Sequence, residues 1–246
     1  MSFFSKIKFL TKIHNRKQRS SLENIEHKND LYSKFSSDKF NQNLNSVKDI
    51  QGWRNRLIDS IPNFNEDVNF IDLGCGLGDK TYRAINNLNL KNKNIFLVDF
   101  SNKATKIFSN FCKNDNVSIY NCDVILALDK IEDNSLDIII AFGLIHELDD
   151  RKSFFLKLKK KMKQNSLLYI SDNDLYFSAN ELNTELQECK VDNCVYMRIL
   201  KLFNIHIFYR VSYKNNFSKF LSFYHQERSD KIISISSTFN NVLKKI

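Results

Sequence analysis

Residues 69–80 read Asn-Phe-Ile-Asp-Leu-Gly-Cys-Gly-Leu-Gly-Asp-Lys, and this stretch decides the fold class. Residues 70–73 form a short apolar run that is typical of a buried strand. The turn that follows holds three alternating glycines: Gly74, Gly76 and Gly78. Because the whole chain of 246 residues has only five glycines, three in one turn indicate a bound ligand rather than a simple bend. A helix is expected directly afterwards, over about residues 80–88, and its first N–H groups would face that ligand.

The identity of residue 79 narrows the choice of ligand. The dinucleotide fingerprint G-x-G-x-x-G would need glycine at this position, and the chain has Asp79. A carboxylate beside a pyrophosphate is repulsive, so NAD and FAD are disfavoured. The phosphate-binding pattern GxxxxGK[ST] is also absent from the sequence.

The sequence after the turn alternates strands with helices. Further buried strands are predicted over residues 94–98, 117–120, 136–142 and 165–171, and a basic helix ends at 157–163. This order is typical of a parallel sheet with helices on both faces.

Residues 70–78 resemble the class I S-adenosylmethionine-dependent methyltransferases, whose pattern is [VILF]-[IVL]-D-[LV]-G-x-G-x-G. The segments ending in Asp99, Asp123, Phe142 and Asp172 are similar to the later motifs of that family, in the same order. The last of them departs from L-K-P-G-G-x-L-x-I-x-D, because its proline and both glycines are replaced and Asn165 and Ser166 must make the turn. The resemblance implies a Rossmann-like, doubly wound α/β sheet of seven strands, with the last strand antiparallel and completed by a terminal β-hairpin.

The same resemblance implies S-adenosylmethionine as methyl donor and no metal. Asp99 would accept the two ribose hydroxyls of the cofactor, since one carboxylate can accept both bonds. Asp123 would bind the adenine amino group, with an ordinary loop acid as the alternative. Cys75 is interpreted as a small filler rather than a nucleophile. The implied cofactor residues are Asp72, Gly74, Cys75, Gly76, Gly78, Asp99, Phe100, Asp123, Val124, Phe142 and Gly143.

His146 is the candidate general base for methyl transfer. It directly follows the predicted strand 136–142, where acceptor-facing residues sit at the carboxyl ends of strands. A base is needed only if the acceptor must lose a proton. The alternative is a helix-end or core histidine, and Glu147 beside it is expected to face solvent or cap a helix.

The position of the single proline, Pro62, excludes two classes of nucleic-acid acceptor. Methylation of exocyclic amines on bases uses [DN]-P-P-[YFW], and this chain has Ala-Phe-Gly-Leu at 141–144. Cytosine-C5 methylation uses a Pro-Cys nucleophile and is excluded for the same reason. We therefore expect a small-molecule or lipid-like acceptor, with RNA or protein methylation, or a non-catalytic binding protein of the same fold, as alternatives.

Composition adds weaker constraints. The net charge of +9 could attract an anionic partner such as nucleic acid, but it is spread along the chain and is interpreted mainly as a compositional bias. The five cysteines form no CxxC pair, which argues against a disulfide framework or a structural zinc site. The longest apolar run, 138–145, is too short to cross a bilayer, so an integral membrane protein is not expected.

The ends of the chain carry less information. Residues 1–22 hold six basic and no acidic residues. They could form a basic amphipathic helix that touches a membrane surface, an organelle (mitochondrial) transit peptide or a frayed tail. A cytoplasmic location is the default expectation.

A tail with cap helices is expected over 1–62 and the catalytic domain over 63–246. Residues 35–54 are faintly similar to the segment before the glycine turn in ubiquinone- and menaquinone-pathway C-methyltransferases, with a core Trp53 as the alternative. Helices are expected over 50–61, 179–203 and 216–226, with a break near Asp192 as the alternative to one continuous helix over 179–203. Strands are expected over 205–213 and 232–236.

Overall fold

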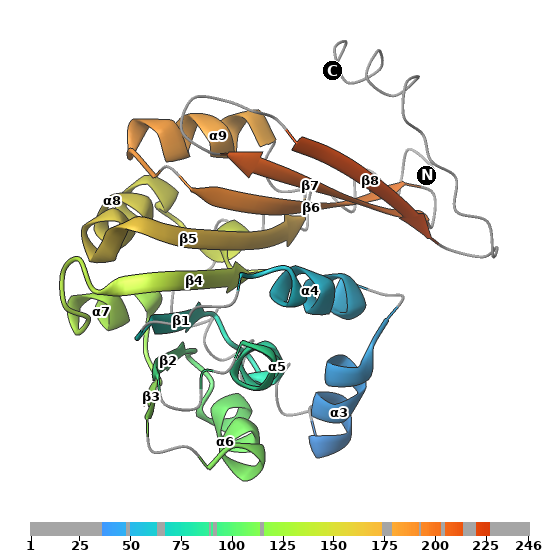
Figure 1. Cartoon of the computed structure of the whole chain (residues 1–246), viewed down its shortest axis with the longest axis vertical. Helices are drawn as coiled ribbons and strands as arrows, with labels where there is room; N and C mark the ends of the chain where they lie inside the picture. The colour runs from blue at the N-terminus through green and yellow to red at the C-terminus, as the bar shows by residue number, and fades with distance from the viewer. Residues whose placement is uncertain are drawn as a thin grey trace.

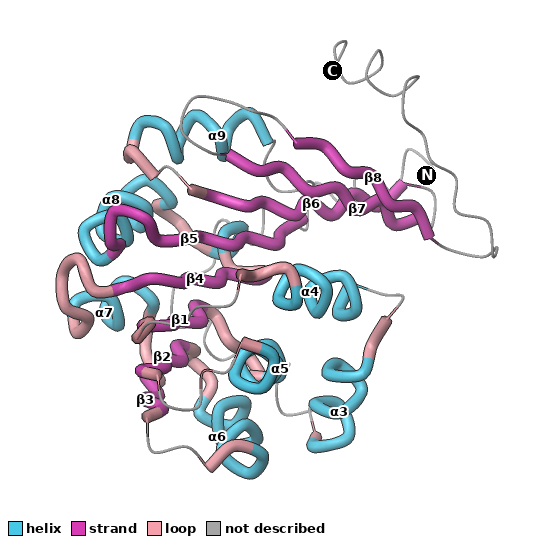
Figure 2. Tube along the Cα trace, viewed as in Figure 1, coloured by secondary structure: helices cyan, strands magenta, loops and turns pink. Residues whose placement is uncertain are grey.

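The computed structural model describes a doubly wound α/β sheet with helices on both faces (Figures 1 and 2). It describes residues 36–47, 50–62, 67–88, 90, 93–113, 116–173, 179–191, 193–202, 205–213 and 220–226. The expectations for residues 1–22 and for a strand at 232–236 lie outside these ranges.

Among the described residues, eight strands form one sheet in the order β3-β2-β1-β4-β5-β6-β7-β8. The first six are parallel, β7 runs antiparallel to β6, and β8 runs antiparallel to β7. The described part of the chain thus has eight strands where seven were expected, and its reversed strand, β7, is followed by one more strand. The strands are β1 (Asn69–Leu73), β2 (Asn94–Val98), β3 (Val117–Tyr120), β4 (Leu136–Phe142), β5 (Met162–Asn173), β6 (Cys194–Leu202), β7 (Ile205–Tyr213) and β8 (Phe220–Gln226).

Each face of the sheet has its own hydrophobic core, because successive side chains of a strand point to opposite sides. In β1, Ile71 and Leu73 belong to one core and Phe70 to the other. One face is covered by α3 (Ser37–Asn45), α4 (Ile50–Asp59), α5 (Asp79–Asn87) and α6 (Asn102–Phe111). The opposite face is covered by α7 (Val124–Asp129), α8 (Arg151–Lys161) and α9 (Ala179–Glu188).

Two helix predictions in the C-terminal part are wrong. The helix expected over 179–203 ends with α9 at Glu188, and residues 194–202 form β6, which pairs with β7 along its length and with β5 over residues 194–199. The helix expected over 216–226 is replaced by β8. Both segments contain β-branched or aromatic residues, and sheet pairing overrides the weak helical pattern.

The turn expected at Asn165 and Ser166 lies inside β5, as an irregularity of the strand. From Leu136 to Ile138, β4 advances two residues, while the partner positions on β5 advance five, from Met162 to Leu167. The Ser166 hydroxyl donates to the carbonyl of Lys163 at 2.7 Å and closes this excursion.

Within the described ranges, no helix is long and apolar enough to cross a membrane.

Candidate active site

The glycine turn at 74–78 is fastened to the neighbouring strand β2. The amides of Gly74 and Cys75 both donate to the carbonyl of Val98, at 2.8 and 3.0 Å. Gly74, Gly76 and Gly78 have φ values of +72°, +53° and +74°, in the left-handed region that favours glycine. The turn is therefore shaped by its glycines and held at the carboxyl edge of β1 and β2.

Asp99 directly follows β2 and fixes the next part of the turn. Its Oδ2 accepts from the Gly76 amide and its Oδ1 from the Ser101 amide, both at 2.8 Å. These two bonds orient a buried carboxylate beside the glycines. This is the place at which the sequence predicted an acceptor of ribose hydroxyls.

Asp72 is buried at the end of β1 and accepts from the Thr81 hydroxyl at 2.6 Å. Burial, together with the nearby negative charges of Asp79 and Asp99, raises the pKa of Asp72 to about 7, although the Thr81 bond acts in the opposite direction. Three carboxyl groups thus lie close to one another around the glycine turn. A cation bound there would relieve their mutual repulsion.

Cys75 lies in the turn between two glycines and is buried. Burial, with a further contribution from Asp99, raises the pKa of its thiol well above the usual value. A thiol that stays protonated is a poor nucleophile, so the interpretation of Cys75 as a small filler agrees with its surroundings.

Asp123 has a structural role as the N-cap of α7. Its Oδ1 accepts from the Ile125 amide at 2.7 Å. It also lines the cavity described below, with Val124 and Phe100. Asp123 thus both caps a helix and lines the cavity, and its contact with adenine stays a prediction.

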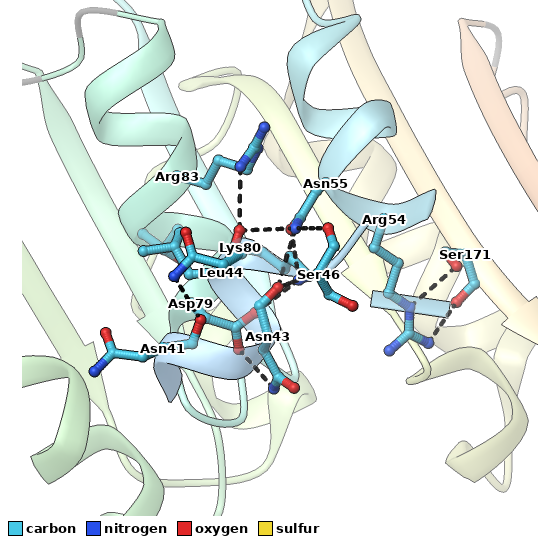
Figure 3. Close-up of polar contacts among 12 residues, drawn as sticks. Asn41, Asn43, Leu44, Ser46, Arg54, Asn55, Asp79, Lys80, Arg83 and Ser171 are labelled. Atoms are coloured by element: carbon cyan, nitrogen blue, oxygen red, sulfur yellow. Dashed lines mark hydrogen bonds and ion pairs between the residues drawn. The ribbon is translucent and has the colours of Figure 1, made fainter. Parts of the chain in front are cut away.

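Helices α3 and α4 form the opposite wall, and a buried polar network joins them to α5 (Figure 3). Asn55 Nδ2 donates to the carbonyls of Asn43, Leu44 and Ser46 at 2.9–3.0 Å. Its Oδ1 accepts from Lys80 Nζ at 2.7 Å. One asparagine of α4 thus closes the end of α3 and ties both helices to the start of α5.

Lys80 and Asp79 form a buried ion pair at the start of α5, with Nζ and Oδ2 2.7 Å apart. Burial lowers the pKa of Lys80, while the adjacent Asp79 works in the opposite direction. Asn43 donates to Asp79 Oδ1 at 3.4 Å, so the pair also contacts α3. A buried charge of this kind needs all these partners, because removing one leaves the other uncompensated.

Arg54 points from α4 toward the ends of β4 and β5 (Figure 3). Its Nε donates to the Ser171 hydroxyl at 3.2 Å and one terminal nitrogen to the Ser171 carbonyl at 3.4 Å. The guanidinium carbon lies 5.9 Å from the centre of the Phe142 ring. Gly143 has a φ of +73°, and a Cβ at this position would lie 2.9 Å from the guanidinium, so the close approach depends on glycine.

His146 lies in the short 3-10 helix η1 (Ile145–Glu147) after β4. Its Nδ1 is 2.6 Å from Asp172 Oδ1, its backbone amide donates to Asp172 Oδ2 at 3.1 Å, and its Nε2 is 3.1 Å from Glu147 Oε1. Burial lowers the pKa of His146, but the bonds to Asp172 and Glu147 raise it more, to about 9. In this arrangement the imidazole is protonated at neutral pH.

Most of these groups line one cavity of about 430 Å³. Of the predicted site residues, only Gly78 is outside the lining: it ends the turn as the N-cap of α5 and packs against Phe108. The cavity is lined by Lys39, Asn43, Gln51, Arg54, Asp72, Gly74, Cys75, Gly76, Leu77, Asp79, Lys80, Asp99, Phe100, Cys122, Asp123, Val124, Phe142, Gly143, Leu144, His146, Glu147 and Leu148.

The lining suits a ligand that carries both charges and hydroxyls. Asp72, Asp79 and Asp99 favour cationic groups beside the glycine turn, and Arg54 offers donors for an anionic group. S-adenosylmethionine has a sulfonium, an ammonium, a carboxylate and two ribose hydroxyls, so its chemistry matches this donor and acceptor set. Among the residues that the structure describes, no cluster of potential metal ligands occurs.

A sequence model of a methyltransferase-domain family matches residues 64–234, which is more than half of the chain. The chain therefore belongs to that family, and it is an S-adenosylmethionine-dependent methyltransferase, as the resemblance of its glycine turn predicted. Comparison with curated protein sequences gives no match.

Solved structures with a similar fold include two S-adenosylmethionine-dependent methyltransferases. The one from Aquifex aeolicus is 17% identical, with a TM-score of 0.48, over 68% of this chain and 90% of that chain. The one assigned to this class from Methanococcus maripaludis is 18% identical, with a TM-score of 0.48, over 67% and 84%. An arsenic(III) S-adenosylmethionine methyltransferase from Chlamydomonas reinhardtii is 16% identical, with a TM-score of 0.48, over 58% and 57%.

Sequence reasoning missed Arg54, Asn55, Lys80 and Asp172 as parts of this site. Trp53-Arg54 was noted in a faint similarity, but Trp53 is buried in the core, as its alternative interpretation stated, and it is Arg54 that lines the cavity. Asn55 and Lys80 carried no local signal, because their hydrogen-bond partners in the network are 9–37 residues away, and the ion pair of Lys80 with the adjacent Asp79 does not by itself indicate a site.

Proposed function

We propose that this methyltransferase transfers a methyl group to a small-molecule or lipid-like acceptor, with the cofactor held along the carboxyl ends of β1, β2 and β4. The observation that carries the proposal is the single cavity that brings the glycine turn, Asp99, Asp123 and His146 together. Bound S-adenosylmethionine supplies a methyl group on a positively charged sulfur.

The residues of the chain divide into binding groups and one acceptor-facing group. Asp99, already oriented by two backbone amides, would accept the ribose hydroxyls, and Asp123 the adenine amino group. Arg54 is the cation best placed to meet the carboxylate of the cofactor, because Ser171 and Phe142 hold it beside Gly143. Phe142, Phe100 and Val124 supply apolar contact and exclude water. The main contribution to rate would come from orientation, which can supply about 7–11 kcal/mol at best.

His146 is proposed as the proton-handling residue at the acceptor end. A position after β4 places it next to Gly143 and Leu144 in the cavity lining. RNA methylation is the second candidate, favoured only by the net charge of +9.

Isothermal titration with S-adenosylmethionine, S-adenosylhomocysteine and NADH tests the cofactor part of the proposal. We expect the first two to bind and NADH not to bind. Asp99→Ala should weaken binding about tenfold or more, because a charge-assisted bond contributes roughly 1.5–3 kcal/mol. Asp149→Ala, at an exposed position, is the matched control and should bind as the unchanged chain does. Unchanged affinity in Asp99→Ala would remove Asp99 from the site.

A labelled methyl donor identifies the acceptor class. The chain is incubated with separate lipid, metabolite, RNA and protein fractions, and the label is followed into each. Label in the lipid or metabolite fraction supports the proposal, and label confined to RNA supports the second candidate.

A further inference from the structure

Asp172 holds His146 at two points from behind the cavity. It lies at the carboxyl end of β5 and is only 1% exposed. One carboxylate oxygen accepts a hydrogen bond from the backbone amide of His146 at 3.1 Å, and the other oxygen lies 2.6 Å from Nδ1. Because an ionised carboxylate only accepts, this contact assigns a proton to Nδ1. The ring is thus fixed in both position and tautomer.

The opposite ring nitrogen faces Glu147. Nε2 lies 3.1 Å from Glu147 Oε1, and both side chains line the cavity, whereas Asp172 is not among the lining residues. The acceptor end of the cavity therefore presents a histidine whose outer nitrogen is occupied by a carboxylate that is itself partly exposed.

Cationic side chains of two helices lie near the carboxyl end of β5. Arg151 of α8 acts on Asp172 electrostatically and is paired with Glu185 of α9 at 2.6 Å. On the other side, Arg54 of α4 bonds to Ser171, the residue before Asp172. Cations thus approach the end of β5 from both faces of the sheet.

We propose that Asp172 is the positioning residue for His146 and that Glu147 is a gate. The Glu147 carboxylate occupies Nε2 of the His146 ring, and the acceptor displaces this carboxylate when it binds. The proposal rests on the proposed function, since it concerns the acceptor end of the same cavity. When Glu147 leaves Nε2, His146 loses one of the two carboxylates that keep it protonated, and its proton can pass to solvent.

The neutral ring can then serve as base while Asp172 keeps the proton on Nδ1. The acceptor's lone pair forms the bond to the methyl carbon, and the electron pair of the broken sulfur–carbon bond stays on sulfur. The proton that the acceptor loses goes to Nε2 of His146. Charge balances, because the sulfonium becomes neutral and the imidazole becomes an imidazolium.

Nuclear magnetic resonance titration of the full chain tests the arrangement without an acceptor. The His146 ring signal is assigned by its loss in His146→Gln. We expect it to titrate near pH 9. Asp172→Asn should lower that pKa by about one unit or more, and Glu147→Gln should lower it too. The exposed Asp149→Asn is the matched control and should leave it unchanged.

The outcomes separate this inference from the proposed function. If the pKa of His146 is the same in the unchanged chain and in Glu147→Gln, the gate is overturned. If it is the same in the unchanged chain and in Asp172→Asn, the positioning role is overturned. If Asp172→Asn fails to fold, the partly exposed Glu147→Gln still decides the gate. Cofactor binding in the titration above is independent of both results.

Activity toward the acceptor found in the label screen gives a second readout. Glu147→Gln should move the acidic limb of the pH–rate profile to lower pH. Asp172→Asn should lower kcat by about tenfold or more while KM changes little, because the ring is misdirected and the acceptor contacts remain. A fall confined to KM would instead make Asp172 a structural residue only.

Discussion

The two walls of the cavity are built by different means. The strand-end wall, made of the turn at 74–78, Asp99 and Phe142–Gly143, is held mainly by backbone bonds between neighbouring strands, with one further bond from the Gly76 amide to the Asp99 carboxylate. The helical wall, made of α3 and α4, is held by side chains that reach α5 and β5, mainly Asn55, Lys80 and Arg54. Backbone bonds tolerate most substitutions, whereas a side-chain bond is lost with its residue.

This difference predicts how each wall fails. In the strand-end wall only the glycines and the carboxylates are irreplaceable, because the remaining geometry comes from the sheet. In the helical wall single polar residues are decisive, since Asn55 alone bonds to three carbonyls. Substitution of a glycine or a carboxylate in the strand-end wall should therefore damage the fold or abolish binding. Substitution of a polar residue in the helical wall should loosen the cavity while the sheet survives.

The largest effect is expected for Gly78→Val. A β-branched residue at a φ of +74° is strained, and a Cβ there would lie 2.5 Å from a Phe108 ring carbon. Strain and overpacking together should cost about 2–6 kcal/mol of the free energy of unfolding. Thermal unfolding and cofactor titration measure the result, with Gly78→Ala as the milder comparison. A valine variant as stable as the unchanged chain would show that the turn is not shaped by its glycines.

A smaller effect is expected for Asn55→Ala. Three carbonyls of the segment at 43–46 and the Lys80 ammonium lose their shared partner, which should cost about 2 kcal/mol or more. Cofactor affinity should fall several-fold. The dissociation rate should change more than the association rate, and stopped-flow fluorescence would measure both. Asn41→Ala, an exposed asparagine on α3, is the matched control. Equal behaviour of the two variants would mean that the helical wall does not depend on this network.

The smallest effect concerns pH and Asp72. Its pKa of about 7 means that it is largely protonated below that pH, whereas a cationic ligand favours the ionised form and lowers the pKa in the complex. Cofactor affinity should therefore rise with pH up to about 7 and then level off, by at most about tenfold per pH unit. Calorimetry in buffers of different ionisation enthalpy would detect the released proton. Asp72→Asn should flatten the dependence; a slope that persists in it would assign the titration to another group.

The strand-end wall was also the part that the sequence predicted well. The bounds of β2, β3 and β4 agree with the strands expected from apolar runs, and the glycine turn lies where its pattern indicated. Outside this wall, the bounds of β7 agree with the strand expected from its alternating pattern. Strands that are buried on both faces have a continuous apolar signal, and the acids that follow them stand out by contrast. The carboxyl ends of parallel strands then meet at one edge, so the topology itself assembles Asp72, Asp99 and Asp123.

The helical wall and the C-terminal strands could not be predicted in the same way. Asn55 and Lys80 are ordinary polar residues on helices until the fold brings them 2.7 Å apart. The segment of β6, Cys-Val-Tyr-Met-Arg-Ile-Leu-Lys-Leu, fits a helical or a strand pattern, and only its pairing with β5 and β7 decides. Asp172 ended a predicted strand, but its contact with His146 depends on two elements 26 residues apart.

The bonds from Gly74 and Cys75 to the Val98 carbonyl have a consequence for amide hydrogen exchange. These two N–H groups join the ends of β1 and β2, which are both interior strands of the sheet, so they become exposed to solvent only when these two strands separate. The amides of α3, in contrast, can open when one helix detaches from the surface. The glycine turn should therefore exchange as slowly as the core of the sheet, and the helix that faces it should exchange much faster, although both border the same cavity.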